Sequence, residues 1–325
     1  MGEMIRRQYV LPLRPDASPA VVEEMLEVLR DADRFIPGLL DSSAAVADGG
    51  TTVIWENSFV DEAAYTGPYM VHPYHVAAID DFLMPDSPTA LVFRSYAARF
   101  TTDDATQTLR SGIRRVVLLS LDSDEQIAAV ETLTTDPPSM TTSAFGRDDV
   151  GWVSGKGRAF THVWEQGFVD RDELQTHLEA RSGSGADRLA ELGLDDDAME
   201  IFVHPFSLRP PDEQDPPPMP ADDVPVRYSL THRATAEDAD ELLGLLERHY
   251  DPFMADNGAR FVGRTRSVDG GYPMVEIDSA WELPSLASYN DMRSGLAMAT
   301  DWGLFVRDSI PLIRGGRRRF HRLDQ

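Results

Sequence analysis

The hydrophobic and polar positions along the chain predict the same small unit three times, as strand, helix, strand, hairpin, strand, helix, strand. In the first unit Ser18 and Pro19 form a helix start, and apolar residues follow at helical spacing: Val22, Met25, Leu26 and Leu29. The strands of this unit are predicted at residues 9–13, 42–47, 51–59 and 90–96, and its second helix at 73–82. A four-stranded antiparallel sheet with two helices on one face is a ferredoxin-like αβ sandwich, which belongs to the α+β class.

Shared sequence identifies the units as internal repeats. Residues 52–61 read TVIWENSFVD and residues 161–170 read THVWEQGFVD, so Thr, Trp, Glu, Phe, Val and Asp recur in register. Residues 274–289 (MVEIDSAWELPSLASY) match more loosely. A Gly-Gly hairpin signal precedes this strand in the first and third units.

The chain therefore divides into repeat 1 (residues 1–100), repeat 2 (112–208) and repeat 3 (226–325). Residues 209–225 are rich in proline and acid and predict a stiff, solvated linker. A polar stretch at 101–111 predicts the break between repeats 1 and 2. The remaining signals are a capping box at 123–126, closing strands at 200–203 and 319–323, a first strand of repeat 3 at 227–231, and a helix face of Leu242, Leu243, Leu246 and Tyr250.

The face of each sheet that carries no helix must also be covered, so such units commonly pair sheet to sheet. Three units cannot all pair within one chain, and we expect two chains to associate as a homodimer. Strand alternation places Glu56 and Glu165 on this second face. A carboxylate there needs a cationic partner, for which Arg7 and Arg114 are the candidates.

Composition removes several classes of function. The 325 residues include no cysteine, which excludes disulfides, thiolate nucleophiles and Cys-ligated metals. A net charge of −25 opposes nucleic acid and anionic membranes as partners, and the basic run at 317–322 is predicted to be a solvated last strand. We find no leader and no apolar stretch of about 18 residues, and expect a cytoplasmic protein. Phosphate-loop and dinucleotide motifs are missing, so we expect no cofactor.

The candidate chemistry lies in YMVHPYH, from Tyr69 to His75. Pro73 suits a first helical position, which makes His72 the cap and His75 the third helical residue. The positive end of the helix dipole should keep His75 a neutral proton acceptor, with Tyr69 as a hydrogen-bond donor to a developing enolate. A structural alternative is that both rings only cap and pack the helix start.

A metal site would use His72 and His75 with Asp80 or Asp81, but no third ligand is fixed by the sequence, and we expect no metal. Strand alternation instead predicts an aromatic small-molecule pocket under the helices, unless its tryptophans are plain core. The candidate substrate-binding residues are His72, Trp55, Asn57, Val53, Tyr74, Arg7, His162 and Trp164.

Repeat 1 contains the strand TVIWENSF, the string Y-x-x-H-P-x-H and the closing strand ALVFRSY. In these three segments it resembles the stress-responsive A/B barrel (Dabb) domain of the dimeric α/β barrel superfamily. The resemblance implies that the three tandem units pair into dimeric α/β barrels. A related polyketide cyclase, which makes olivetolic acid, implies proton transfer by Tyr69 and His75. Two further pocket histidines of that cyclase fall on Arg7 and Val53 here, while repeat 2 has His162 at the third-strand place.

The leading hypothesis is a cofactor-independent cyclase, isomerase or lyase that acts on a polyketide-like or aromatic small molecule by general-base proton abstraction. A cofactor-free monooxygenase, which the superfamily also contains, is the second hypothesis. The third is a non-catalytic ligand-binding or assembly protein.

Overall fold

The computed structural model describes residues 4–70, 72–84, 87–91, 96–102, 109–135, 140–147, 160–183, 199–209, 224–267, 274–295 and 300–323. The chain forms two compact units, and each is described by itself. Unit 1 comprises Met1–Pro15, Leu26–Tyr69 and Arg94–Asp215, and unit 2 comprises Asp16–Met25, Met70–Phe93 and Pro216–Gln325. The linker predicted at 209–225 lies almost wholly outside the described residues.

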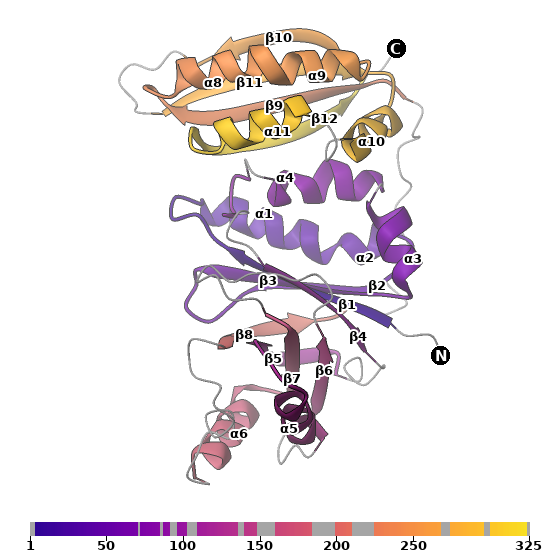
Figure 1. The fold of residues 1–325 in the computed structure, drawn as a ribbon, viewed down its shortest axis with the longest axis vertical. Helices are drawn as coiled ribbons and strands as arrows, with labels where there is room; N and C mark the ends of the chain where they lie inside the picture. Colours follow the sequence, from indigo (N-terminus) through magenta and orange to yellow (C-terminus); the bar gives the residue numbers. More distant parts are fainter. Residues whose placement is uncertain are drawn as a thin grey trace. The chain divides into compact units, whose positions relative to one another are not determined.

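Each repeat contains one four-stranded antiparallel sheet, and all three sheets have the same strand order (Figure 1). Repeat 1 has the order β2 (Leu39–Val46), β3 (Thr52–Phe59), β1 (Met4–Pro12), β4 (Tyr96–Thr102). Repeat 2 has β6 (Thr142–Arg147), β7 (His162–Phe168), β5 (Ser111–Leu119), β8 (Met199–Ser207). Repeat 3 has β10 (Arg260–Arg266), β11 (Met274–Leu283), β9 (Val226–Thr235), β12 (Ile313–Arg322). The predicted ferredoxin-like α+β fold is confirmed.

The three helices whose starts the sequence predicts begin at Pro19, Pro73 and Asp124, as expected. Repeat 1 has α1 (Pro19–Arg30), α2 (Ala32–Phe35), α3 (Glu62–Ala64), η1 (Tyr65–Tyr69), η2 (His75–Ile79) and α4 (Asp80–Leu83). Repeat 2 has α5 (Asp124–Thr135) and α6 (Arg171–Gly183). Repeat 3 has α8 (Ala239–Leu245), η6 (Leu246–Tyr250), α9 (Asp251–Asp256), α10 (Leu286–Gly295) and α11 (Thr300–Ser309). Met25 and Leu29 of α1 are fully buried, as their spacing predicts. Ser123 caps α5 by accepting a hydrogen bond of 3.2 Å from the backbone N–H of Gln126.

The fourth strand of repeat 1 differs from its prediction at 90–96. The structure places β4 at Tyr96–Thr102, so the polar stretch that begins at Thr101 starts within the strand. The reason is the length of β1, which begins at Met4 rather than near Tyr9. The extra residues of β1 pair with β4 as far as Met4 opposite Thr102. Residues 92–95 lie outside the described residues.

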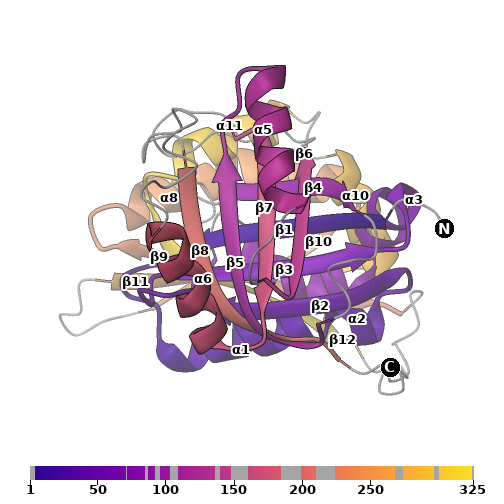
Figure 2. The same cartoon turned by 90° about the horizontal axis from the view of Figure 1, so that it is seen from below.

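Within unit 1 the sheets of repeats 1 and 2 pack against each other by the faces that carry no helix. Figure 2 shows the strands of repeat 2 crossing over those of repeat 1. Side chains from both sheets share one hydrophobic cluster: Val10, Ala47 and Ile54 from repeat 1, and Val116, Leu118, Phe160 and Val163 from repeat 2. Two ferredoxin-like repeats of a single chain thus form the sheet-to-sheet pair.

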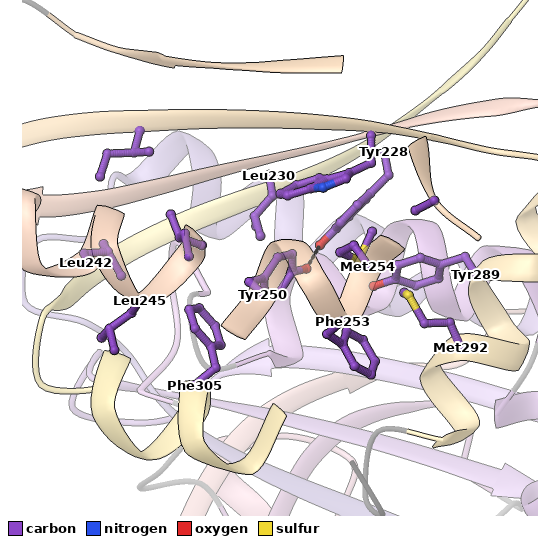
Figure 3. Close-up of a cluster of buried hydrophobic side chains, with 14 of the residues drawn as sticks. Tyr228, Leu230, Leu242, Leu245, Tyr250, Phe253, Met254, Tyr289, Met292 and Phe305 are labelled. Carbon is purple, nitrogen blue, oxygen red and sulfur yellow. Dashed lines mark hydrogen bonds between the residues drawn. The ribbon is translucent and has the colours of Figure 1, made fainter. Parts of the chain in front are cut away.

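The third sheet is amphipathic. One face carries the core of repeat 3, in which the hydroxyls of Tyr228 and Tyr250 lie 3.2 Å apart (Figure 3). The other face carries polar pairs, among them Arg227 with Glu282 at 2.9 Å. A polar second face is compatible with water, since antiparallel sheets often bury only one side. The homodimer therefore stays a prediction. Among the described residues, no helix has the length and apolar character needed to cross a membrane.

Candidate functional site

The helix-facing side of the repeat 1 sheet gathers four of the eight predicted substrate-binding residues: Arg7, Val53, Trp55 and Asn57. Tyr9 lies opposite Trp55, and Arg7 lies opposite Asn57, in the antiparallel register of β1 and β3. Val53 continues the same face and is fully buried. Because side chains alternate along a strand, all five share one surface. Strand alternation read from the sequence placed Val53, Trp55 and Asn57 on one face, and the pairing of β1 with β3 adds Arg7 and Tyr9.

Trp55 is a fixed wall of this surface. Its indole N–H donates to Oγ of Ser42 at 2.9 Å, and Ser42 in turn donates to the carbonyl of Leu29 in α1 at 2.6 Å. The ring of Tyr9 stacks on Trp55 with centroids 5.3 Å apart and an interplanar angle of 17°. These contacts tie the sheet to α1 and hold both rings rigid.

Two polar side chains are enclosed beside these rings. The guanidinium carbon of Arg7 lies 3.9 Å from the ring centroid of Tyr9 and 4.9 Å from that of Tyr65, a cation–π arrangement on two rings. Asn57 is fully buried. In the described part of the chain, neither the oxygen nor the nitrogen of its carboxamide has a hydrogen-bond partner. Such a group costs about 1–3 kcal/mol when left unpaired, so it needs an explanation.

Tyr69 completes the aromatic lining in unit 1. It ends the π-helical turn η1 and is fully buried. Its ring meets Phe59 edge to face, with centroids 4.8 Å apart at 81°, and stacks with Tyr65 at 6.0 Å. Tyr65 therefore links Tyr69 to the cation of Arg7.

His75 lies in unit 2, and its helix starts as predicted. The backbone N–H of Tyr74 donates to Nδ1 of His72 at 3.2 Å, and the N–H of Val76 donates to the carbonyl of His72 at 3.0 Å. His72 is thus the cap of a helix whose first residue is Pro73. His72 and Tyr74 are half-buried, whereas His75 is 3% exposed.

A π-helical turn sets the surroundings of His75. In η2 the backbone N–H of Asp80 bonds to the carbonyl of His75, five residues earlier. Nδ1 of His75 lies 3.6 Å from Oδ1 of Asp80. Residues five apart on an α-helix do not face each other, so the wider turn is what brings this pair together. Both side chains are almost fully buried.

The neighbouring carboxylate of Asp81 is bound to strand β12. It accepts from the backbone N–H of Arg318 and lies 3.3 Å from Nε of Arg317. Arg317 also pairs with Glu24 of α1. Burial alone lowers the pKa of Arg317, but the hydrogen bond that Arg317 donates to Glu24 and the charge of Asp81 outweigh it and raise the pKa. Among the described residues, no group of three histidines or carboxylates is placed to hold a metal ion.

Tyr69 and His75 thus belong to different units. Tyr69 lies with Arg7 and Asn57, and His75 lies with Asp80 and β12. Joint action of the two residues stays a prediction.

The repeat 2 candidates occupy the outer face of their own sheet. His162 stacks on Phe145 with centroids 5.2 Å apart at 7°, and its Nδ1 lies 2.9 Å from Oγ1 of Thr161. Burial lowers the pKa of His162, and the charge of Arg147 lowers it further. The indole of Trp164 donates to Oγ of Ser143 at 3.0 Å. Because the two sheets pack by their other faces, these residues do not reach the surface of Arg7 and Asn57.

The paired faces hold a buried ionic cluster. Nε of Arg6 lies 2.8 Å from Glu165, and its Nη2 lies 3.4 Å from Glu56. Arg114 repeats this pattern, with Nε 3.3 Å from Glu56 and Nη1 against Glu165. All four side chains are at most 1% exposed. Each arginine therefore bridges both glutamates across the two sheets.

This cluster corrects one of the two expected partners. Arg114 is a partner of the glutamates, as predicted, but Arg7 is not, because strand alternation turns it to the helix side. Arg6 takes that place. A signal in the sequence could have found it, since Ile-Arg-Arg occurs at 5–7 and again at 113–115, at equal register against the two repeated strands.

Electrostatics keep the cluster charged. Burial alone raises the pKa of Glu56, but Arg114, His204 and Arg6 outweigh it and lower the pKa to about 2. Nε2 of His204 lies 3.2 Å from Oε1 of Glu56. Burial also lowers the pKa of Arg114 to about 10, which leaves the guanidinium protonated at neutral pH.

The strand order and the paired faces define the class: a tandem of ferredoxin-like αβ sandwiches, two of which pair within the chain. No family model matches the sequence, and no curated protein matches it. The chain is similar in structure to a NIPSNAP family protein from Agrobacterium tumefaciens (18% identity, 33% of this chain and 93% of that one, TM-score 0.28). It is also similar to a protein provisionally assigned as a monooxygenase from Lactobacillus acidophilus (10% identity, 64% of this chain and 94% of that one, TM-score 0.38). A further similar structure is provisionally assigned as a chlorite dismutase (13% identity, 63% of this chain and 95% of that one, TM-score 0.37).

Proposed function

We propose that repeat 1 binds a planar, oxygen-bearing small molecule of the aromatic or polyketide-like kind. In this proposal the protein is a cofactor-independent cyclase, isomerase or lyase that removes a proton from that molecule. The observation that carries the proposal is the carboxamide of Asn57, which is fully buried and has no hydrogen-bond partner in the described part of the chain. Native proteins rarely leave such a group unpaired unless a ligand or water satisfies it.

The surroundings of Asn57 define the chemistry of the ligand. Aromatic walls from Tyr9, Trp55 and Tyr65 favour a flat ring, and the amide N–H groups donate to a carbonyl or enolate oxygen. The guanidinium of Arg7 supplies positive charge on the same surface. Fixed donors and positive charge of this kind stabilise negative charge that develops on an oxygen during proton removal.

His75 is the proposed general base, on the resemblance described above. Its imidazole is buried, and Asp80 lies 3.6 Å from Nδ1. A carboxylate beside one ring nitrogen orients the ring and leaves the other nitrogen as the proton acceptor.

Binding can be tested by calorimetric titration with salicylate, using the Asn57→Leu variant. Gln166→Leu is the matched control, because Gln166 occupies the same register position in repeat 2. We expect Asn57→Leu to weaken binding by about tenfold or more, which corresponds to the loss of one good hydrogen bond, and Gln166→Leu to leave it unchanged. Equal affinity in the two variants would contradict the proposed site.

Proton removal can be tested with benzoylacetone, a carbon acid that carries an aromatic ring. The wild-type protein should accelerate deuterium exchange at the carbon between its two carbonyls, and both His75→Ala and Asn57→Leu should lose this acceleration. Oxygen uptake in the same reaction would favour the monooxygenase hypothesis. Salicylate binding without any exchange would favour the ligand-binding hypothesis.

A further inference from the structure

Unit 2 joins repeat 3 to the helix that carries His75. That helix meets repeat 3 through side chains of two kinds. Val76 is 1% exposed and belongs to the hydrophobic cluster of repeat 3. Asp81 is 5% exposed and is bound to β12 by the backbone N–H of Arg318 and by Arg317.

The contact to β12 is needed on energetic grounds. A carboxylate as buried as that of Asp81 is costly unless a cation or hydrogen-bond donor compensates it. β12 is an edge strand of its sheet, so the backbone N–H of Arg318 is available to a side chain from outside the sheet. Arg317 supplies the positive charge, and Glu24 of α1 holds its guanidinium from the other side.

The π-helical turn makes the helix dependent on such support. π turns are uncommon and occur mostly as single turns, often at functional positions. In η2 this turn places Asp80 against His75, and Asp81 follows directly in the chain. The charged group beside the imidazole is thus Asp80, and the next residue, Asp81, begins a chain of contacts to Arg317 and the Arg318 backbone of β12 and on to Glu24 of α1.

We propose that repeat 3 serves as the support for the His75 helix and that Arg317 is its positioning residue, acting on His75 through Asp81. This inference rests on the proposed role of His75 as the base. It gives the third repeat a task that neither repeat 1 nor repeat 2 performs. In this proposal the two carboxylates differ in role, since Asp80 lies 3.6 Å from Nδ1 of the imidazole and Asp81 anchors the helix to β12.

The test compares Arg317→Ala, Arg317→Lys and Arg319→Ala in the full chain. Arg319 is the matched control, because it lies two positions further along the same strand and is exposed. The readouts are the ¹⁵N shifts of the His75 imidazole and the amide hydrogen exchange of His75–Leu83. We expect Arg317→Ala to change the shifts and to speed exchange by about tenfold or more, Arg317→Lys to restore most of both, and Arg319→Ala to change neither. Unchanged His75 signals in Arg317→Ala would overturn the inference.

Amide exchange in β9 shows whether repeat 3 itself stays folded. If Arg317→Ala also loses protection in β9, Asp81→Ala is compared with Asp81→Asn, since the asparagine oxygen still accepts from the Arg318 N–H. The inference then requires altered His75 signals in Asp81→Ala and rescue in Asp81→Asn, and the absence of rescue contradicts it. The variants can show these patterns while the wild-type protein exchanges no benzoylacetone proton. That combination would contradict the proposed function but would leave the supporting role of repeat 3 intact.

Discussion

Repeats 1 and 2 build the same frame but treat their polar groups differently. In both, a tryptophan of the repeated strand donates to a serine of the neighbouring strand, Trp55 to Ser42 and Trp164 to Ser143. In both, an arginine lies opposite an amide on the helix-facing side. In repeat 2, Nη1 of Arg115 donates to the carbonyl oxygen of Gln166 at 2.6 Å. The shorter amide of Asn57 has no such partner among the described residues.

This difference separates the structural positions from the candidate functional ones. In repeat 2 the arginine donates to the amide oxygen, and only Nε2 of Gln166 is left without a hydrogen-bond partner among the described residues. In repeat 1 the arginine lies against two tyrosine rings, and among the described residues both polar atoms of the Asn57 amide lack a partner. Real proteins break the rules of polar satisfaction mainly at functional sites. The comparison therefore supports the proposal that repeat 1 is the binding repeat.

The largest expected effect concerns the buried ionic cluster that repeats 1 and 2 share. Arg6→Ala should destabilise unit 1 by about 3–5 kcal/mol, because it leaves the buried charges of Glu56 and Glu165 with half of their cations. Arg114→Ala should cost a similar amount if the cluster is symmetric. Urea unfolding followed by circular dichroism measures both. A cost below about 1 kcal/mol, as for a surface ion pair, would show that the cluster is not buried in solution.

A smaller effect is expected from acid. The pKa of Glu56 is about 2 in the folded protein, against an ordinary value of 4.5. Because the folded pKa is lowered, its stabilisation is complete above about pH 4.5 and is lost as the pH falls towards 2. The linked free energy is on the order of 3 kcal/mol. The urea concentration at the unfolding midpoint should decrease as the pH is lowered from about 4.5 to 2. In the Glu56→Gln variant this decrease should be smaller. An equally steep fall in Glu56→Gln would assign the acid sensitivity to other groups.

The smallest effects concern the serine partners of the two tryptophans. Ser42→Ala and Ser143→Ala each remove the acceptor of a buried tryptophan N–H. Ser143→Ala should cost about 1 kcal/mol, as the loss of one hydrogen bond does, and Ser42→Ala about 2 kcal/mol, because it also removes the hydrogen bond that Ser42 donates to the Leu29 carbonyl. Thermal unfolding of the two variants provides the measurement. A much larger cost for Ser42→Ala would mean that the frame of repeat 1, and not only its polar pair, has diverged from that of repeat 2.

Periodicity alone predicted most of the fold. Alternation located β3 within one residue, and the proline and histidine of the helix start placed the cap at His72. The start of β1 was less visible, because Arg6, Arg7 and Gln8 look like polar residues ahead of a strand. They are strand residues whose polar side chains pair with glutamates between the sheets, as Arg6 and Gln8 do, or lie on aromatic rings, as Arg7 does. No local sequence pattern shows these partners. The shift of β4 follows from the same hidden residues.

The candidate site was predictable in composition but not in arrangement. Asn57 and Trp55 were identified from strand faces and Arg7 from the family resemblance, and the three lie on one surface. The separation of His162 and Trp164 from that surface could not be seen, since it depends on which sheet faces pack together. The contact of Asp80 with His75 also escaped prediction, because a π turn has no clear sequence signal.

The central proposal is that repeat 1 keeps both polar atoms of its amide for a ligand, whereas repeat 2 pairs its amide oxygen with an arginine. It is tested most directly by urea unfolding of Asn57→Leu and Gln166→Leu side by side. Leucine at 57 removes an unsatisfied polar group and should stabilise unit 1 by about 1 kcal/mol. Leucine at 166 deprives Arg115 of an acceptor and should destabilise it by about 2 kcal/mol. Urea midpoints that move in opposite directions would support the account. Midpoints that fall by similar amounts in both variants would contradict it.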